Sequence, residues 1–112
     1  MKESDLQISC VQWFNIQYPR IMIFHIPNGG RRSKSEGARF KKMGVLAGIP
    51  DLFIAEALND KHGLFIELKT DKGRSTSKQL DAQAELRLRG YEVHECHGFG
   101  EFQNIVRKYI GG

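Results

Sequence analysis

The chain has 112 residues, 40% hydrophobic and 27% charged, a composition that excludes collagen-like, disordered and low-complexity proteins. This length favours one domain over residues 1–112, and no apolar stretch approaches the roughly 20 residues that a membrane helix needs. The formal net charge of +4 hints at an anionic partner. Cys10 and Cys96 do not resemble a disulfide framework and no secretory signal is evident, so we expect a reduced, cytoplasmic protein.

The first half of the chain predicts two helices and one strand. Residues 3–18 have the pattern of an amphipathic helix that Pro19 ends, and residues 21–25 predict a short buried strand. Turn residues at 26–30 open a basic segment, and a short helix at 36–43 follows, closed by Gly44 in a left-handed conformation. The side chains that fall on one side of the first helix are Leu6, Cys10, Trp13, Phe14 and Gln17.

The second half of the chain alternates strands with helices. Strands at 50–57 and 63–69 are joined by a five-residue loop, which predicts a hairpin. A helix at 76–89, with apolar residues one turn apart and Gly90 as its stop, precedes a strand at 91–96 and a helix at 99–109. This order predicts an α/β fold, a mixed sheet flanked by helices, with a parallel crossover around the 76–89 helix. The apolar residues of that helix are Leu80, Ala84 and Leu88.

Positive charge is concentrated between residues 28 and 44, where Glu36 is the single acidic residue. Such a cluster can neutralise several phosphates and release their counterions. A basic surface that serves only solubility explains the charge equally well, so charge alone leaves both interpretations open. The basic residues of the segment are Arg31, Arg32, Lys34, Arg39, Lys41 and Lys42.

Three charged residues accompany the two strands of the predicted hairpin. In the second strand Glu67 and Lys69 share one face, opposite to the face of the apolar residues, and Asp51 heads the first strand. A loop centred on Asp60 would place Asp51 opposite Lys69 and close to Glu67. Two adjacent carboxylates repel each other, and a divalent cation with a preference for hard oxygen ligands, Mg²⁺ or Mn²⁺, resolves the repulsion.

Each of these residues also has a structural explanation. Glu67 and Lys69 could form an ordinary ion pair at a strand end, and Asp51 could belong to a turn. The three together, inside two apolar strands, favour a site. A zinc site at residues 94–97 is disfavoured, because His94, Cys96 and His97 lack the usual ligand spacing.

At these positions the sequence resembles the VRR-NUC domain of the PD-(D/E)XK nucleases. Pro50-Asp51 and Glu67-Leu68-Lys69 correspond to the motif that names the superfamily. Further matching segments cover most of the chain, and the family's α-β-β-β-α-β order agrees with the predicted elements apart from the added short helix at 36–43 and the C-terminal helix at 99–109. The other matching segments are His25-Ile26-Pro27-Asn28-Gly29, Gly44, Gly48-Ile49, Leu52, Phe65-Ile66, Gln79, Leu86 and Gly90-Tyr91.

The resemblance implies a role for each matching position. Asp51, Glu67 and the backbone carbonyl of Leu68 would hold the Mg²⁺ or Mn²⁺ ion, and Lys69 would lie beside the attacking water, where it either orients the water or helps to remove its proton. Glu3 would be a fourth acidic ligand; the helical spacing from Leu6 and Cys10 supports this independently, although a favourable charge in the first helical turn explains it as well.

Two further positions keep alternatives open. Gln79 would touch the active site near Lys69, yet Thr76-Ser77-Lys78-Gln79 also fits a capping box. His25 could contact a phosphate or a group around the metal, or it could be an ordinary structural residue.

DNA is the partner that the resemblance implies, read by shape through its backbone and not by base edges. Stand-alone relatives suggest a homodimer that cleaves four-way (Holliday) junctions in a bacterial or phage-infected cell. A flap or end-processing nuclease and a catalytically silent DNA-binding module are the alternatives; the intact acidic set speaks against the second. The expected DNA contacts are His25, Asn28, Arg31, Arg32, Lys34, Arg39, Lys41 and Lys42.

Overall fold

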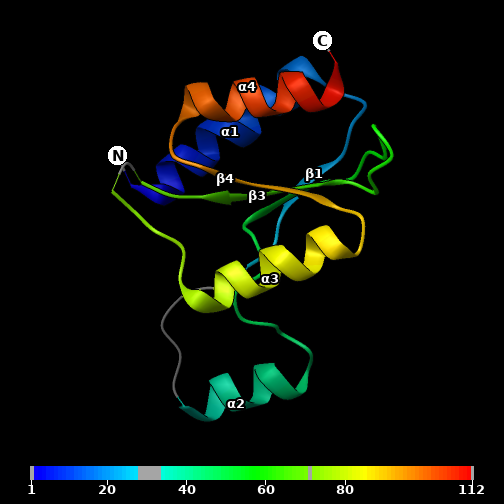
Figure 1. Ribbon diagram of the computed structural model, residues 1–112. Coiled ribbons are helices and arrows are strands. Elements are labelled where there is room, and N and C mark those ends of the chain that lie inside the picture. The colour runs from blue at the N-terminus through cyan, green and yellow to red at the C-terminus, as the bar shows by residue number, and fades with distance from the viewer. Residues whose placement is uncertain (1, 28–33, 71, 112) are drawn as a thin grey trace.

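A four-stranded sheet in the order β1-β2-β3-β4 lies at the centre of the computed structural model, which describes residues 2–27, 34–70 and 72–111 (Figure 1). β1 pairs with β2 and β2 with β3 in antiparallel orientation, whereas β3 and β4 are parallel. The predicted hairpin and the predicted parallel crossover are therefore confirmed. The strands are β1 (Ile23–His25), β2 (Leu52–Ile54), β3 (Leu64–Leu68) and β4 (Glu92–Cys96).

The helices cover the two faces of this sheet unequally. α1 and α4 pack together on one face, α3 covers the other face, and α2 stands beyond α3, away from the sheet (Figure 1). The order of helices and strands agrees with the predicted α/β fold. The helices are α1 (Glu3–Gln17), α2 (Lys34–Lys42), α3 (Ser77–Leu88) and α4 (Phe99–Ile110).

The hydrophobic core lies between the sheet and the α1/α4 layer. β3 alternates as its sequence predicts, so that Leu64, Ile66 and Leu68 are fully buried on the core side. On the opposite face, Phe65 makes ring contacts with Phe53 and Tyr91. The core residues from the helices are Leu6, Cys10 and Phe14 of α1 and Phe102, Val106 and Tyr109 of α4.

The first part of the chain differs from its prediction in two places. Among the described strands, β1 lies at the edge of the sheet and pairs with β2 alone, and Phe24 is 43% exposed, so the expectation of a buried strand is wrong. Gln17 is exposed in the last turn of α1, although the helical pattern places it on the inner side.

The register of the hairpin also differs from the prediction. Leu52 pairs with Ile66, so the continuation of the ladder brings Asp51 beside Glu67 and not opposite Lys69. Two local features cause the shift. The chain reverses between Asn59 and Asp60, which have left-handed φ angles of 57° and 61° and lie between the bridged residues Leu58 and Lys61. The segment between Ile54 and Leu58 is also one residue longer than the segment between Lys61 and Leu64, which moves the ladder by one further residue. The strands are shorter than predicted.

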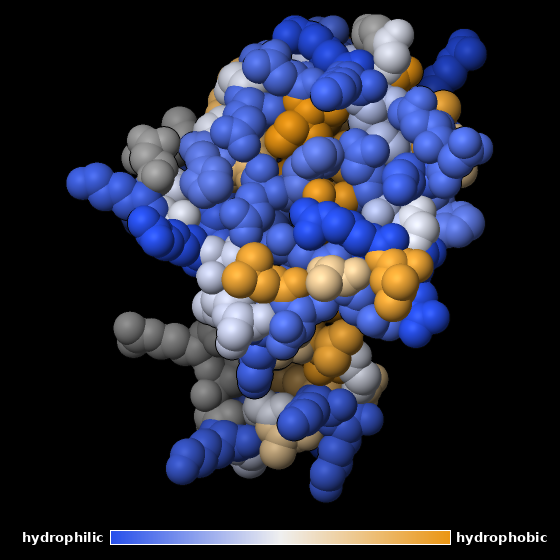
Figure 2. All heavy atoms as spheres, in the orientation of Figure 1, coloured by the Kyte–Doolittle hydropathy of each residue, from blue (hydrophilic) through white to orange (hydrophobic). Residues whose placement is uncertain are grey.

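The apolar stripe of α3 faces away from the sheet. Leu80 is 52% exposed and Leu88 is 75% exposed, with Ala84 exposed between them, whereas the buried residue of this helix is Gln83. Figure 2 shows an apolar row across the region of α3. The polar residues of α3 instead pack toward β3 and β4, which shows that tertiary contacts outweigh the apolar pattern here.

Candidate active site

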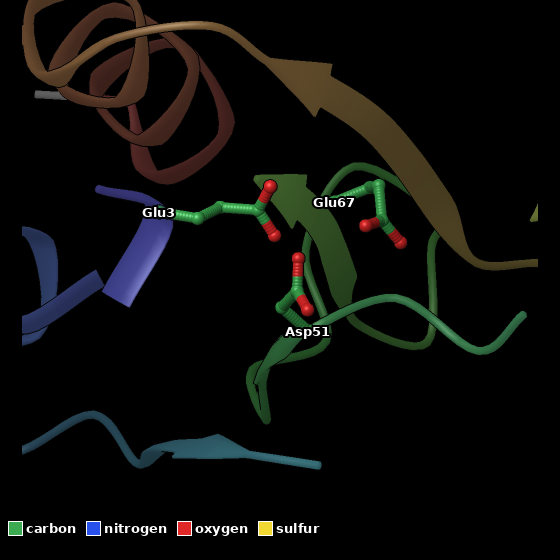
Figure 3. Close-up of side chains that lie close together, drawn as sticks. All are labelled: Glu3, Asp51 and Glu67. Atoms are coloured by element: carbon green, nitrogen blue, oxygen red, sulfur yellow. The ribbon is translucent and has the colours of Figure 1, made fainter. Parts of the chain in front are cut away.

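Three carboxylates from separate segments meet at one end of the sheet (Figure 3). Glu3 is the first residue of α1, Asp51 directly precedes β2, and Glu67 lies near the end of β3. One oxygen atom from each carboxylate lies within 4.8 Å of the other two. Among the described residues, these are the acidic, histidine and cysteine side chains close enough to share one ion; Asp5 is not part of the group.

Glu67 is the most buried member, with 2% of its surface exposed. Its Oε2 accepts a hydrogen bond from Gln79 Nε2 at 3.3 Å and lies 3.7 Å from Lys69 Nζ. Its Oε1 is buried without a hydrogen-bond partner in residues 2–27, 34–70 and 72–111. Burial, followed by the neighbouring Asp51 carboxylate, raises the pKa of Glu67 to about 8.

Asp51 is held in place from both sides. Its Oδ2 accepts a hydrogen bond from the backbone N–H of Leu68 at 2.7 Å. Its backbone carbonyl accepts from the N–H of Ile26 at 2.8 Å and lies 2.8 Å from His25 Nδ1. The structure thus places His25 against the backbone of Asp51, where it joins the edge strand to the residue that starts β2.

Glu3 is the exposed member of the group. Desolvation comes first among the causes that raise its pKa, and the charge of Asp51 comes second. Both causes reflect the position of its carboxylate beside the other two, which Figure 3 shows pointing from α1 toward Asp51. The helix start therefore supplies a third acidic group to the cluster.

Lys69 extends the site along β3. Its side chain is 90% buried, and Nζ donates a 2.8 Å hydrogen bond to Gln79 Oε1 while it faces Glu67 Oε2. A buried ammonium group needs such partners, because the desolvation of a charge without compensation is costly. The predicted neighbourhood of Asp51, Glu67 and Lys69 is confirmed, although the register that produces it is different.

Gln79 satisfies both of the interpretations that the sequence left open. Its backbone N–H donates to Thr76 Oγ1 at 3.2 Å and its Oε1 accepts from the N–H of Thr76 at 2.8 Å, which completes the capping box of α3. The same Oε1 accepts from Lys69, and Nε2 donates to Glu67. One side chain therefore caps the helix and contacts the site.

The sequence did not single out a second polar group beside these residues. Glu95 pairs with Glu67 in the β3–β4 ladder, accepts hydrogen bonds from Ser75 Oγ and from Gln83 Nε2, and has a pKa lowered mainly by Ser75. The sequence offered one signal for Glu95: it lies two residues after Val93 in β4, so the two side chains are on the same face of the strand.

The histidines near Glu95 make separate contacts. His94 lies 2.9 Å from Glu92, and His97 lies 3.3 Å from the carbonyl oxygen of Gly73. Cys96 is buried and donates to the carbonyl of Gly98. The structure does not gather these residues into a zinc site within the described part of the chain.

Apart from His25, which lies against the backbone of Asp51, the predicted DNA contacts divide into two sets. Lys34, Arg39, Lys41 and Lys42 are exposed on α2, which lies apart from the acidic cluster (Figure 1). Asn28, Arg31 and Arg32 lie outside the described residues. The structure therefore shows a basic helix and an acidic site as separate regions.

The residues of the acidic cluster fit a divalent cation. All three side chains offer oxygen atoms, the donors that Mg²⁺ and Mn²⁺ prefer. The buried Oε1 of Glu67 has a free lone pair and no described donor to satisfy it. A cation would also offset the repulsion from Asp51, which adds to the larger effect of burial in raising the pKa of Glu67.

The fold and the cluster together define a nuclease domain of the PD-(D/E)XK type. The sequence matches the VRR-NUC domain family over residues 1–100, so the chain belongs to this family. A solved structure described as a VRR_NUC domain protein has a TM-score of 0.84 and 30% identity, over 99% of this chain and 89% of that one.

A second solved structure, described as a VRR_NUC domain, shares the fold with a TM-score of 0.65 at 18% identity, over 96% of both chains. The comparison with curated proteins gave no match. Across the described residues, no helix has the length and apolar character needed to cross a membrane.

Proposed function

We propose that the chain, as one nuclease domain over residues 1–112, hydrolyses phosphodiester bonds of DNA with the help of Mg²⁺ or Mn²⁺. The observation that carries this proposal is the group of three carboxylates within 4.8 Å, beside a buried lysine. Asp51, Glu67, Glu3 and the carbonyl oxygen of Leu68 would hold the ion. When bound, the ion lowers the pKa of a coordinated water and stabilises the charge that develops on the phosphate.

The protein's own groups orient the reactants. Lys69 lies beside Glu67 and orients the attacking water, whose oxygen forms a bond to phosphorus. The water releases one proton to the solvent as this bond forms. The bond from phosphorus to the 3′ oxygen breaks and the 3′ oxygen takes up a proton from the solvent, which leaves a 3′-hydroxyl and a 5′-phosphate. Gln79 holds Lys69 through its amide oxygen and Glu67 through its amide nitrogen.

We further propose branched DNA, a four-way junction above all, as the substrate of a homodimer. The exposed cations of α2 support contacts with the DNA backbone, to which Asn28, Arg31, Arg32 and His25 would add. A symmetric pair of cuts needs two active sites that a two-fold axis relates. The exposed apolar stripe on α3 offers surface for such an association.

A panel of labelled DNAs tests the reaction and the substrate. Four-way junction, flap, splayed-arm and plain duplex molecules are incubated with Mg²⁺ or Mn²⁺ and either the native chain or the Glu67→Gln variant. We expect paired cuts in the junction, with 5′-phosphate ends, by the native chain alone. If the native chain cuts flaps in preference to junctions, the flap is the substrate and the junction proposal is wrong. If it cuts none of the four DNA molecules, the nuclease proposal itself is wrong.

A matched pair of surface variants tests the homodimer. Leu88 on α3 and Ile16 on α1 are exposed to nearly the same extent, 75% and 76%. We expect Leu88→Glu to convert a dimer into a monomer in light-scattering measurements, whereas Ile16→Glu leaves the dimer intact. A native chain that is monomeric at all concentrations would contradict the homodimer.

A further inference from the structure

The first turn of α3 is bonded directly into the candidate active site. The backbone N–H of Thr76 and Nζ of Lys69 both donate to the same atom, Oε1 of Gln79, at 2.8 Å each. The other end of the amide, Nε2, donates to Oε2 of Glu67. The helix cap and the charged groups of the site are therefore joined through one planar side chain.

The chemistry of these partners defines one orientation of the Gln79 amide. A backbone N–H can only donate, and so can an ammonium group, so the side of the amide that faces Thr76 and Lys69 must be its oxygen. Because the amide is planar, its NH₂ group then points toward the carboxylate of Glu67. In the reverse orientation, the NH₂ group of Gln79 would face the donors of Thr76 and Lys69, and its oxygen would face the carboxylate of Glu67.

The first turn of α3 is also held in place by its neighbours. Ser75 Oγ donates to Glu95 of β4, the strand residue that pairs with Glu67. On the other side, a Cβ atom at Gly48 would lie 2.6 Å from the carbonyl oxygen of Lys78, and Gly48 has a φ of +90°. The segment that leads to Asp51 thus packs closely against the same turn.

We infer that Thr76 is a positioning residue of the active site, which orients Lys69 and Glu67 through the amide of Gln79. This inference rests on the proposed nuclease function. The backbone N–H of Thr76 selects the orientation of the amide, and Oγ1 keeps the first turn closed around it. Thr76 caps α3 and acts through Gln79, so its role requires no contact of Thr76 with the DNA or the ion.

A graded series at position 76 tests this inference. Thr76→Ser keeps the hydroxyl and the N–H, Thr76→Ala removes the hydroxyl, and Thr76→Pro removes both while it suits the φ of −72° at this position. Glu85→Gly is the matched control, because it weakens the same helix at an exposed position away from the cap.

Two measurements are made on every variant: the ¹⁵N NMR signals of the Gln79 side-chain NH₂, and kcat and KM for DNA cleavage. We expect Thr76→Ser to match the native chain and Thr76→Ala to lower kcat about tenfold, with a larger loss for Thr76→Pro and a KM that changes little. The Gln79 signals shift in the same order. Glu85→Gly lowers the melting temperature but changes neither kcat nor these signals.

Several outcomes would overturn the inference. Unchanged Gln79 signals in Thr76→Pro would show that Thr76 does not orient the amide. Shifted signals with an unchanged kcat would show that the orientation does not matter for cleavage. If the native chain cleaves none of the DNAs, the nuclease function itself fails, and the NMR signals then report separately whether Thr76 orients Gln79.

Discussion

The acidic end of the sheet and the basic helix α2 are built in opposite ways. The site residues Glu67 and Lys69 are buried, and hydrogen bonds hold their partners Asp51 and Gln79. By contrast, none of the residues of α2 is buried, and this helix stands away from the sheet (Figure 1). An isolated helix of this length is marginal in water, so α2 depends on whatever contacts it.

The difference matches the two proposed roles, catalysis at the acidic end of the sheet and DNA binding by α2. Catalysis on a phosphodiester demands atoms that stay in register to within a fraction of an ångström, and buried hydrogen bonds supply this. Binding to a phosphate backbone demands charge more than geometry, and exposed lysines and arginines supply that. Substitutions in the acidic site should therefore change kcat, whereas substitutions in α2 should change DNA affinity.

The largest effect is expected at the carboxylates. Asp51→Asn or Glu67→Gln removes a ligand charge and should lower kcat by about 1,000-fold or more, because the ion supplies several kcal/mol of transition-state stabilisation. Quantitative cleavage of a labelled junction measures this loss, and DNA affinity in Ca²⁺ should change little. Asp5→Asn, in the same turn of α1 as Glu3 but outside the cluster, is the control. Full activity in both Asp51→Asn and Glu67→Gln would show that these carboxylates do not form the active site.

A smaller effect is expected at Lys69. Lys69→Met keeps most of the length of the side chain without its charge and should lower kcat about 100-fold, the order of magnitude for the loss of a group that positions a reactant. Ion binding should persist, because the carboxylates remain. Single-turnover cleavage with saturating Mn²⁺ separates the two effects, and a variant that recovers native rates at high Mn²⁺ would assign Lys69 to ion binding only.

The basic helix should affect affinity and leave the chemistry intact. Lys41→Gln together with Lys42→Gln should weaken DNA binding and reduce the slope of log K against log salt by about 0.9 for each phosphate that α2 no longer neutralises. Fluorescence anisotropy over a range of salt concentrations measures both. Lys61→Gln with Lys108→Gln, which changes the charge equally beside β4, is the control. An unchanged slope would exclude these α2 residues as phosphate ligands.

The smallest effect concerns stability without metal. Glu67 has a folded pKa of about 8 against an ordinary value of 4.5. Between these values the folded chain keeps a proton that the unfolded chain releases, so the free energy of unfolding falls as the pH rises. In EDTA, the melting temperature should drop from pH 5.5 to pH 8.5 in the native chain and drop less in Glu67→Gln. Equal pH dependence in both proteins would exclude Glu67 as the cause.

The elements that local pattern determines were predictable from the sequence. The period-two alternation of β3 sorts Leu64, Ile66 and Leu68 from Glu67 and Lys69, and the left-handed Gly44 and Gly90 mark helix ends as expected. The neighbourhood of Asp51 and Glu67 also follows from hairpin topology, and the family resemblance identifies the motif.

Features that depend on tertiary contacts were not predictable in the same way. The hairpin register depends on the left-handed pair Asn59 and Asp60 and on the extra residue between Ile54 and Leu58, and either feature moves every pair of the ladder. The outward stripe of α3 contradicts its apolar pattern, because the polar Gln79 and Gln83 face the sheet and donate hydrogen bonds to the buried Glu67 and the partly buried Glu95. The dual contacts of Gln79 depend on where α3 meets β3, which no local pattern records.

The proposed reaction requires Glu3, Asp51 and Glu67 to bind one divalent cation together. Calorimetric titration of the metal-free chain with Mn²⁺ measures this binding, with Asp51→Asn, Glu67→Gln and the control Asp5→Asn titrated in parallel. We predict one ion per chain in the native protein and in Asp5→Asn, with binding strongly weakened in both site variants. Absence of binding to the native chain, or equal binding to all four proteins, would contradict the account.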